Sequence, residues 1–213
     1  MPAGKYVEFF LHFSPGIIKK VMLSQDLKLT TENIHRQAEK IMISWLKRIR
    51  TKEDHVFFLN WLYGYYSPIE DRIRIQLTPD RFPDMDRRSR ADYLLRDMEE
   101  AGIPLPSPEH CSDFPLIDTF GKALGALYVL EGSTLGGRII ATMLTRQLGS
   151  EKSLSYFNSY GMETEGMWRS FTDFLDSSAT TEVREDALLA AKETFLTFKN
   201  WIEKHELQPE LRL

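Results

Sequence analysis

The spacing of apolar residues predicts helices along most of the chain. Within residues 26–49, Ile34 and Ile41 recur at a helical interval, and Asp26 or Thr30 is a candidate N-cap. No stretch shows the strict apolar–polar alternation of a half-buried strand. The further predicted helices span 54–76, 87–101, 116–149, 163–176 and 181–206. The pattern therefore predicts an all-α fold.

Proline-rich loops separate some of these helices without dividing the chain. Residues 77–86 and 103–115 contain several prolines and no helical period. With 213 residues, no internal repeat and no long linker, a single domain over 25–213 is the simplest organisation. Residues 1–24 lack a clear helical period and are predicted to form an N-terminal extension. Charges interrupt the apolar runs of this extension, so neither a signal peptide nor a transmembrane helix is expected.

Composition narrows the class of protein. The formal net charge of −4 argues against non-specific binding of nucleic acid, which needs a basic surface. Cys111 is the only cysteine, so neither an internal disulfide nor a cysteine-based zinc site is available. These features favour a protein of the reducing cytoplasm, without nucleic-acid or membrane partners.

The most informative segment is a glycine-rich stretch of one predicted helix. Gly132, Gly136 and Gly137 would together cost about 3 kcal/mol of helix stability relative to alanine, so a compensating role is expected. At 100° per residue, Gly121, Gly125, Gly132 and Gly136 fall within about 60° of one another. Such a face has no side chains, and a flat cofactor can lie against its backbone. Close packing against another helix is the alternative for any single glycine.

Among the five histidines, His35 is the best candidate for a metal ligand. It lies within a predicted helix, where Ala38 leaves room beside it and Glu39 follows one turn later. A carboxylate that holds one ring nitrogen is typical of metal-ligating histidines. A core histidine with local partners is the alternative. Because the sequence has no paired Glu-x-x-His motif, a metal bound here is expected to bring its other ligands with it, as heme iron does.

The other four histidines receive no such role. His55 is expected to cap a helix or to face solvent, and His205 is expected to lie at a polar helix C-terminus. His12 belongs to the N-terminal extension and His110 to a proline-rich loop. A single histidine on one helix and a bare glycine face on another together predict a sandwich for a planar macrocycle.

Two longer stretches resemble helices of the heme oxygenase family. LKLTTENIHRQAEK (27–40) resembles the proximal helix of that family. LGALYVLEGSTLGGRII (124–140) resembles the distal helix of bacterial, biliverdin-producing heme oxygenases, including the type that accompanies bacterial phytochromes. Shorter similar segments follow in the family's order: LYGYYSPIE (62–70), YFNSYG (156–161), MWRSF (167–171) and AAKETFLTF (190–198).

The resemblance implies a single-domain helical bundle with heme between the proximal and distal helices. It implies cleavage of heme by O2 and electrons to biliverdin, CO and free iron. His35 would be the axial iron ligand, with Glu39 tuning its hydrogen bonding. Gly132, Gly136 and Gly137 would lie against the distal face of the heme.

The resemblance also implies contacts at the edge of the heme. Lys28 and Arg169 match family positions that face heme propionates, which favour charge-assisted partners. Tyr66 and Phe195 match positions in the pocket wall. Solvated surface cations and ordinary core aromatics are the respective alternatives.

At the distal site, Ser133 replaces an aspartate that orders proton-delivering water in some family members. Many bacterial members also lack that aspartate. The proton path is therefore expected to use water held by backbone carbonyls, by Ser133 or by another helix. Glu131 is expected to project to another side of the helix.

Two other functions remain open at this point. The sequence has no flavin or iron–sulfur motif, so a heme oxygenase would need an external electron donor such as a ferredoxin or a reductase. A non-catalytic heme carrier or sensor on the same fold is one alternative. A helical cofactor-salvage enzyme without heme is the other.

Overall fold

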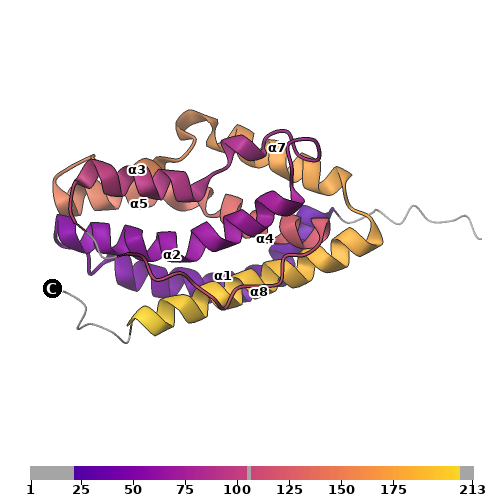
Figure 1. Ribbon diagram of the computed structural model, residues 1–213, viewed down its shortest axis with the longest axis horizontal. Helices are drawn as coiled ribbons and strands as arrows, with labels where there is room; N and C mark the ends of the chain where they lie inside the picture. Colours follow the sequence, from indigo (N-terminus) through magenta and orange to yellow (C-terminus); the bar gives the residue numbers. More distant parts are fainter. Residues whose placement is uncertain (1–21, 105–106, 207–213) are drawn as a thin grey trace, which may run out of the picture.

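The computed structural model describes residues 22–104 and 107–206, and this part of the chain is helical without any strand. Long helices run side by side along the long axis of the molecule (Figure 1). The elements are α1 (Leu23–Leu46), α2 (Lys52–Gln76), η1 (Met85–Arg87), α3 (Arg90–Ala101), α4 (Phe120–Gly132), α5 (Thr134–Leu148), α6 (Ser155–Asn158), η2 (Gly161–Glu163), α7 (Thr164–Ser177) and α8 (Thr181–Glu206). The prediction of an all-α fold is confirmed.

Helix α2 shows how local sequence fixes a helix start. The Thr51 hydroxyl accepts a hydrogen bond from the Asp54 amide at 3.1 Å, and the Asp54 carboxylate accepts one from the Thr51 amide at 3.1 Å. This capping box satisfies two amides of the first turn. Pro68 lies inside α2, which continues through this residue to Gln76.

The start of α1 is fixed by a tertiary contact instead. The helix begins at Leu23 after Met22, whose side chain makes no capping bond, so neither Asp26 nor Thr30 is the N-cap. The Ser24 amide and hydroxyl both donate to the carboxylate of Asp176 on α7, at 2.8 and 2.7 Å. Of the predicted extension, residues 1–21 lie outside the described residues, and the last two residues belong to α1.

The single helix predicted over 116–149 is two helices. Helix α4 begins after Thr119, whose hydroxyl accepts a hydrogen bond from the Lys122 amide at 3.1 Å. Ser133 separates α4 from α5. Its hydroxyl donates to the Leu130 carbonyl at 2.6 Å, and the Thr134 hydroxyl donates to the Glu131 carbonyl at 2.7 Å. These bonds satisfy carbonyls at the end of α4 and stabilise the break.

Helix α8 packs against both α1 and α4 and so organises the core. Its contact with α4 depends on glycine. A Cβ atom at Gly121 would lie 2.7 Å from Cβ of Asp186, and one at Gly125 would lie 2.2 Å from the Ala187 carbonyl oxygen. For these two glycines, close packing against another helix is confirmed, and α8 occupies the face that the four-glycine pattern suggested for a ligand.

Two histidines expected near solvent are buried. His55 is 1% exposed, and its Nε2 lies 2.7 Å from the Ser153 carbonyl oxygen. Burial lowers the pKa of this imidazole. His205 is also buried, with Nδ1 at 2.9 Å from the Trp201 carbonyl oxygen. Charged neighbours in the sequence suggested exposure, but the two rings point into the bundle.

In the described ranges, every helix is too short or too polar to cross a lipid bilayer.

Candidate functional site

His35 lies in the middle of α1 with half of its side chain exposed. Its Nε2 is 3.3 Å from Oε1 of Glu39, one turn further along the helix. Its ring centroid is 5.1 Å from that of Phe195 on α8, so the aromatic ring supports one side of the imidazole. A histidine that is held by a carboxylate and still open to solvent is well placed to bind a metal.

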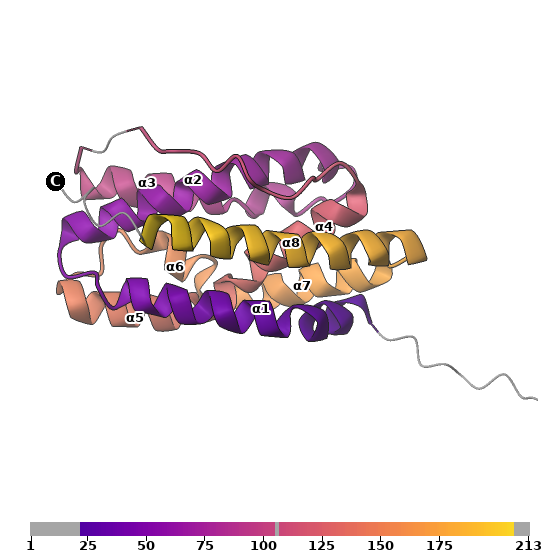
Figure 2. The ribbon, with the colours of Figure 1, turned by 90° about the horizontal axis from the view of Figure 1, so that it is seen from below.

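The opposite side of the site is formed by α5. In the view from below, α1 lies across α5 (Figure 2), whereas in Figure 1 α5 lies above α1. The Gln147 Nε2 group donates to the Leu46 carbonyl at 3.4 Å, which joins the C-terminal ends of the two helices. At 100° per residue, Gly136, Met143 and Gln147 lie within about 40° of one another on α5. Gly136 therefore belongs to the face of α5 that is turned toward α1.

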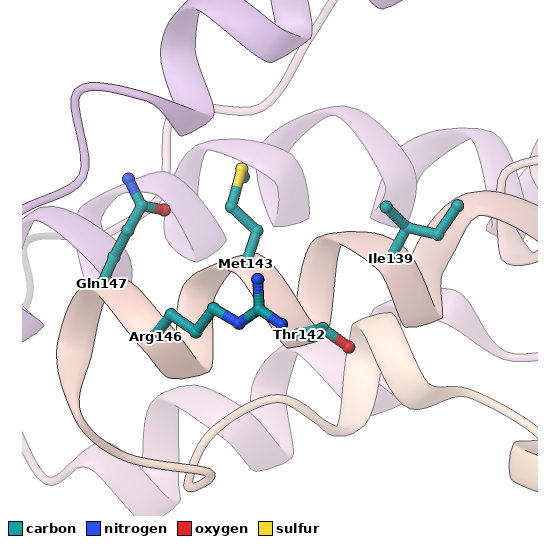
Figure 3. Close-up of a pocket in the computed structure, with 5 residues that line it drawn as sticks. All are labelled: Ile139, Thr142, Met143, Arg146 and Gln147. Carbon is teal, nitrogen blue, oxygen red and sulfur yellow. The ribbon is translucent and has the colours of Figure 1, made fainter.

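A pocket of about 470 Å³ lies along this part of α5. Two of its side chains, Met143 and Gln147, project to the same side of the helix (Figure 3). Nearby, Leu135 and Ile139 expose 47% and 77% of their surface, so this part of α5 presents apolar surface to the outside. The residues that line the pocket are Ile139, Thr142, Met143, Arg146 and Gln147.

The three distal glycines have different surroundings. A Cβ at Gly136 would meet no atom within 4 Å, and one at Gly132 would lie 3.8 Å from Cη2 of Trp168. A Cβ at Gly137 would lie 2.1 Å from the Phe157 carbonyl oxygen. Gly136 thus leaves open space, and a side chain at Gly132 would make ordinary contact with Trp168. Gly137 allows α5 to pack closely against α6. Helix packing accounts for Gly137 without a ligand.

Ser133 is exposed at the break between α4 and α5. Because its hydroxyl hydrogen is donated to the Leu130 carbonyl, the oxygen lone pairs remain for a further hydrogen bond. Ser133 can therefore accept a hydrogen bond from water at the bare surface of the two glycines.

The two predicted wall residues are placed differently. Phe195 contacts His35 directly, as described above. Tyr66 is buried and packs edge-to-face against Tyr156 and Phe198, with centroid distances of 5.7 and 6.1 Å. Tyr66 thus belongs to the aromatic core beneath the site.

The two predicted propionate partners are both exposed cations. Lys28 lies seven residues, or two turns, before His35 and so shares its face of α1. Arg169 lies on α7, next to the Trp168 ring that approaches Gly132. Both side chains are free to reach an anionic group at the edge of the site.

The donor set fits heme better than a bare metal ion. Within residues 22–104 and 107–206, no three His, Cys, Asp or Glu side chains are grouped so that they could hold a metal ion. Helix α1 offers one exposed imidazole, and α5 offers a position without a side chain at Gly136, with exposed Leu135 and Ile139 close by in the sequence. These features suit a planar apolar ligand whose metal needs one protein ligand.

Sequence reasoning missed a buried polar cluster directly behind the distal glycines. Glu131, the residue before Gly132, is 1% exposed and binds Arg88 and Tyr160. The expectation that Glu131 projects away from the site is confirmed. The position of Glu131 before a glycine in a predicted helix indicated that its surroundings are unusual. No local pattern, however, connects it to partners 43 and 29 residues away.

The fold and the site together define a class: an all-α domain that can hold a planar metallomacrocycle between two helices. Two solved structures share the fold. The heme oxygenase of Neisseria meningitidis, solved with NO and CO bound, is 20% identical with a TM-score of 0.72, covering 86% of this chain and 92% of that one. The heme oxygenase of Leptospira interrogans is 19% identical with a TM-score of 0.68, covering 86% and 99%.

Sequence comparison points to the same family. No family model matches the chain. The heme oxygenase PigA of Pseudomonas aeruginosa is 26% identical over 201 residues, which cover 90% of this chain and 96% of that protein. A heme oxygenase of Xanthomonas campestris pv. campestris is 34% identical over 113 residues, or 52% of this chain and 66% of that protein. The chain is thus similar to heme oxygenases in both sequence and fold.

Proposed function

We propose that this protein is a heme oxygenase, which cleaves heme to biliverdin, CO and free iron with O2 and electrons from an external donor. The observation that carries the proposal is the half-exposed His35 of α1, on the side of the bundle where the bare Gly136 face of α5 turns toward α1. The sequence relatives named above support the same activity. We place the catalytic unit within residues 25–213.

On the proximal side, His35 is the proposed iron ligand. Glu39, whose Oε1 lies 3.3 Å from Nε2 of His35, would hold that ring nitrogen and leave the lone pair of the other for the iron. Phe195 packs against the ring and limits its rotation. When bound, the heme supplies both the iron that activates O2 and the ring that is oxidised.

On the distal side, the backbone of α4 and α5 takes the place of side chains. Gly132 and Gly136 allow the helix to approach the heme face closely, and Gly137 keeps α5 in place by packing on Phe157. Ser133 is proposed to orient water there as a hydrogen-bond acceptor. Backbone carbonyls at the break are the other candidates for holding this water.

At the edge of the site, Lys28 and Arg169 are the proposed partners of the heme propionates. Tyr66 supports the pocket from the core rather than from its surface. The electron donor, a ferredoxin or a reductase, is expected to be a separate protein, because the sequence contains no flavin or iron–sulfur motif.

The proposal is tested by adding hemin to the purified protein and recording visible spectra. A Soret band of a histidine-ligated heme is expected. Ascorbate or a reductase system in air should then remove this band and produce biliverdin. A stable Soret band without biliverdin would instead indicate a heme carrier or sensor, and no Soret band would contradict heme binding.

A further inference from the structure

The break between α4 and α5 is held from behind by a buried ion pair. Arg88 is fully buried, and its Nη1 group donates to Oε2 of Glu131, which is 1% exposed. The hydroxyl of Tyr160 donates to the other carboxylate oxygen, Oε1, at 2.7 Å. Both oxygens of Glu131 are thus engaged, by groups from two different segments of the chain.

Arg88 extends this contact to α7. Its Nη2 group donates to the Met167 carbonyl at 3.1 Å and lies 3.3 Å from Oδ2 of Asp84. Met167 precedes Trp168, the ring closest to Gly132. The cluster therefore ties the end of α4 to the part of α7 that lies over the distal glycine.

Burying the two charges of this cluster costs free energy. A buried ion pair is often no more stabilising than apolar residues of the same volume, because both charges lose their hydration. Burial raises the pKa of the Glu131 carboxyl, while Arg88 and Tyr160 favour its charged form. Such a cluster fixes the relative orientation of the segments that it joins, because each of its hydrogen bonds has a defined geometry.

We propose that Arg88, Glu131 and Tyr160 are positioning residues: they fix the angle of the α4–α5 break and thereby the place of Gly132 and Gly136 over the heme. The proposal rests on the proposed function, because it assigns these residues a role in seating the substrate. Fixing the distal backbone restricts the heme to one orientation and so selects which edge of the ring is attacked.

Tyr160→Phe is the mildest test, because it removes one hydrogen bond and leaves the ion pair buried. Hydrogen exchange of the apo protein, followed by mass spectrometry, should be roughly fivefold faster over 130–138, the factor expected from losing one hydrogen bond. Exchange in α8 should stay unchanged. NMR spectra of the heme complex should show more than one heme orientation. The biliverdin produced should become a mixture of isomers.

Tyr65→Phe is the matched control. The Tyr65 hydroxyl is also buried and donates to the Thr194 carbonyl at 2.6 Å, but this bond links α2 to α8. The control should lose a comparable bond without faster exchange over 130–138. Equal exchange at 130–138 in wild type and Tyr160→Phe, with one unchanged isomer pattern, would overturn the proposal.

A second variant separates positioning from stability. Arg88→Met combined with Glu131→Leu replaces both buried charges by apolar side chains, and such replacements often retain or raise stability. The double variant should keep its melting temperature and still exchange faster over 130–138. The exchange data come from apo protein, so they test the positioning role even if wild type fails to convert heme. A failure of wild type to convert heme would contradict only the proposed function.

Discussion

At the scale of single residues, the histidines show that the surroundings of a side chain determine whether it can bind a ligand. Of the histidines in the described ranges, His55 and His205 are buried against carbonyl oxygens, whereas His35 is half exposed and faces a carboxylate. A bond from one ring nitrogen to a carbonyl is compatible with metal binding, so it is the burial of His55 and His205 in the core that keeps them from a ligand arriving from solvent. The local motif predicted the Glu39 carboxylate beside His35, but neither the exposure of His35 nor the burial of the other two.

His35→Ala should abolish axial ligation of heme without unfolding the protein. Alanine is a better helix former than histidine, so helix content by circular dichroism should be unchanged. The visible spectrum of the hemin complex should lose its histidine-ligated form, and added imidazole should partly restore it by occupying the space left by the ring.

His110→Ala is the control for this experiment, since His110 is exposed in the loop before Cys111. This variant should bind and convert heme like wild type. Normal ligation and turnover by His35→Ala would contradict the assignment of the proximal ligand.

At the scale of helices, sequence periodicity predicted which segments are helical but not how tertiary contacts shape them. The 3.6-residue pattern was sufficient for α8, whose bounds match the prediction. The start of α1 depends on Asp176, which is 152 residues from Ser24, and no local signal encodes that bond. Local sequence also does not distinguish the glycines, because Gly121 and Gly125 pack on α8 while Gly136 stays open.

Two neighbouring glycines of α5 offer a matched test of these roles. Gly136→Ala adds a methyl group to open space, and alanine should stabilise the apo helix by up to about 1 kcal/mol. Gly137→Ala drives the same methyl group into the Phe157 carbonyl and should lower apo stability by about 1–3 kcal/mol. Urea unfolding of apo protein measures both effects without the added stability that bound heme would give.

Substitutions at Gly136 should lower heme affinity even though they do not lower apo stability. Gly136→Ala should weaken heme affinity, and the larger Gly136→Leu should nearly eliminate it, while both apo proteins stay at least as stable as wild type. If Gly136→Leu lowered apo stability and still converted heme at the normal rate, Gly136 would be a packing residue and the cofactor role of this face would be wrong.

At the scale of the whole molecule, buried carboxylates join helices that are distant in sequence. Glu70 on α2 is 2% exposed and accepts hydrogen bonds from the Ser89 hydroxyl and from the amides of Arg90 and Ala91, at the start of α3. Asp97 on α3 accepts the Ser155 and Tyr156 amides, both at 2.8 Å. Helix α6, which has no side-chain cap of its own, is thus capped by Asp97 of another helix. Helix α3 has a local cap at Ser89 and gains Glu70 as a second acceptor. This is why the sequence alone did not locate every helix end.

Glu70 should make stability depend on pH in a defined direction. Burial raises its pKa from 4.5 to about 7, against the opposing effect of its amide and hydroxyl donors. Between these two values, the folded protein holds a proton that the unfolded chain has released. The contribution of Glu70 is therefore fully present below pH 4.5 and is lost as pH rises through about 7, by at most about 3 kcal/mol.

Glu70→Gln isolates this effect from the other titrating groups. Raised pKa values of Glu131 and Asp97 act in the same direction, and lowered ones of His55 and His205 act oppositely, but all are shared with wild type. Glutamine does not titrate, so the difference in unfolding free energy, wild type minus variant, should fall as pH rises from 5 to 8.

Glu99→Gln, an exposed change on α3, should give a nearly constant difference over the same range. Urea unfolding of apo protein at several pH values measures all three proteins. A wild-type-minus-Glu70→Gln difference that rises with pH would mean that the three donors hold Glu70 charged in the fold, and that their attraction exceeds the cost of burying the carboxylate.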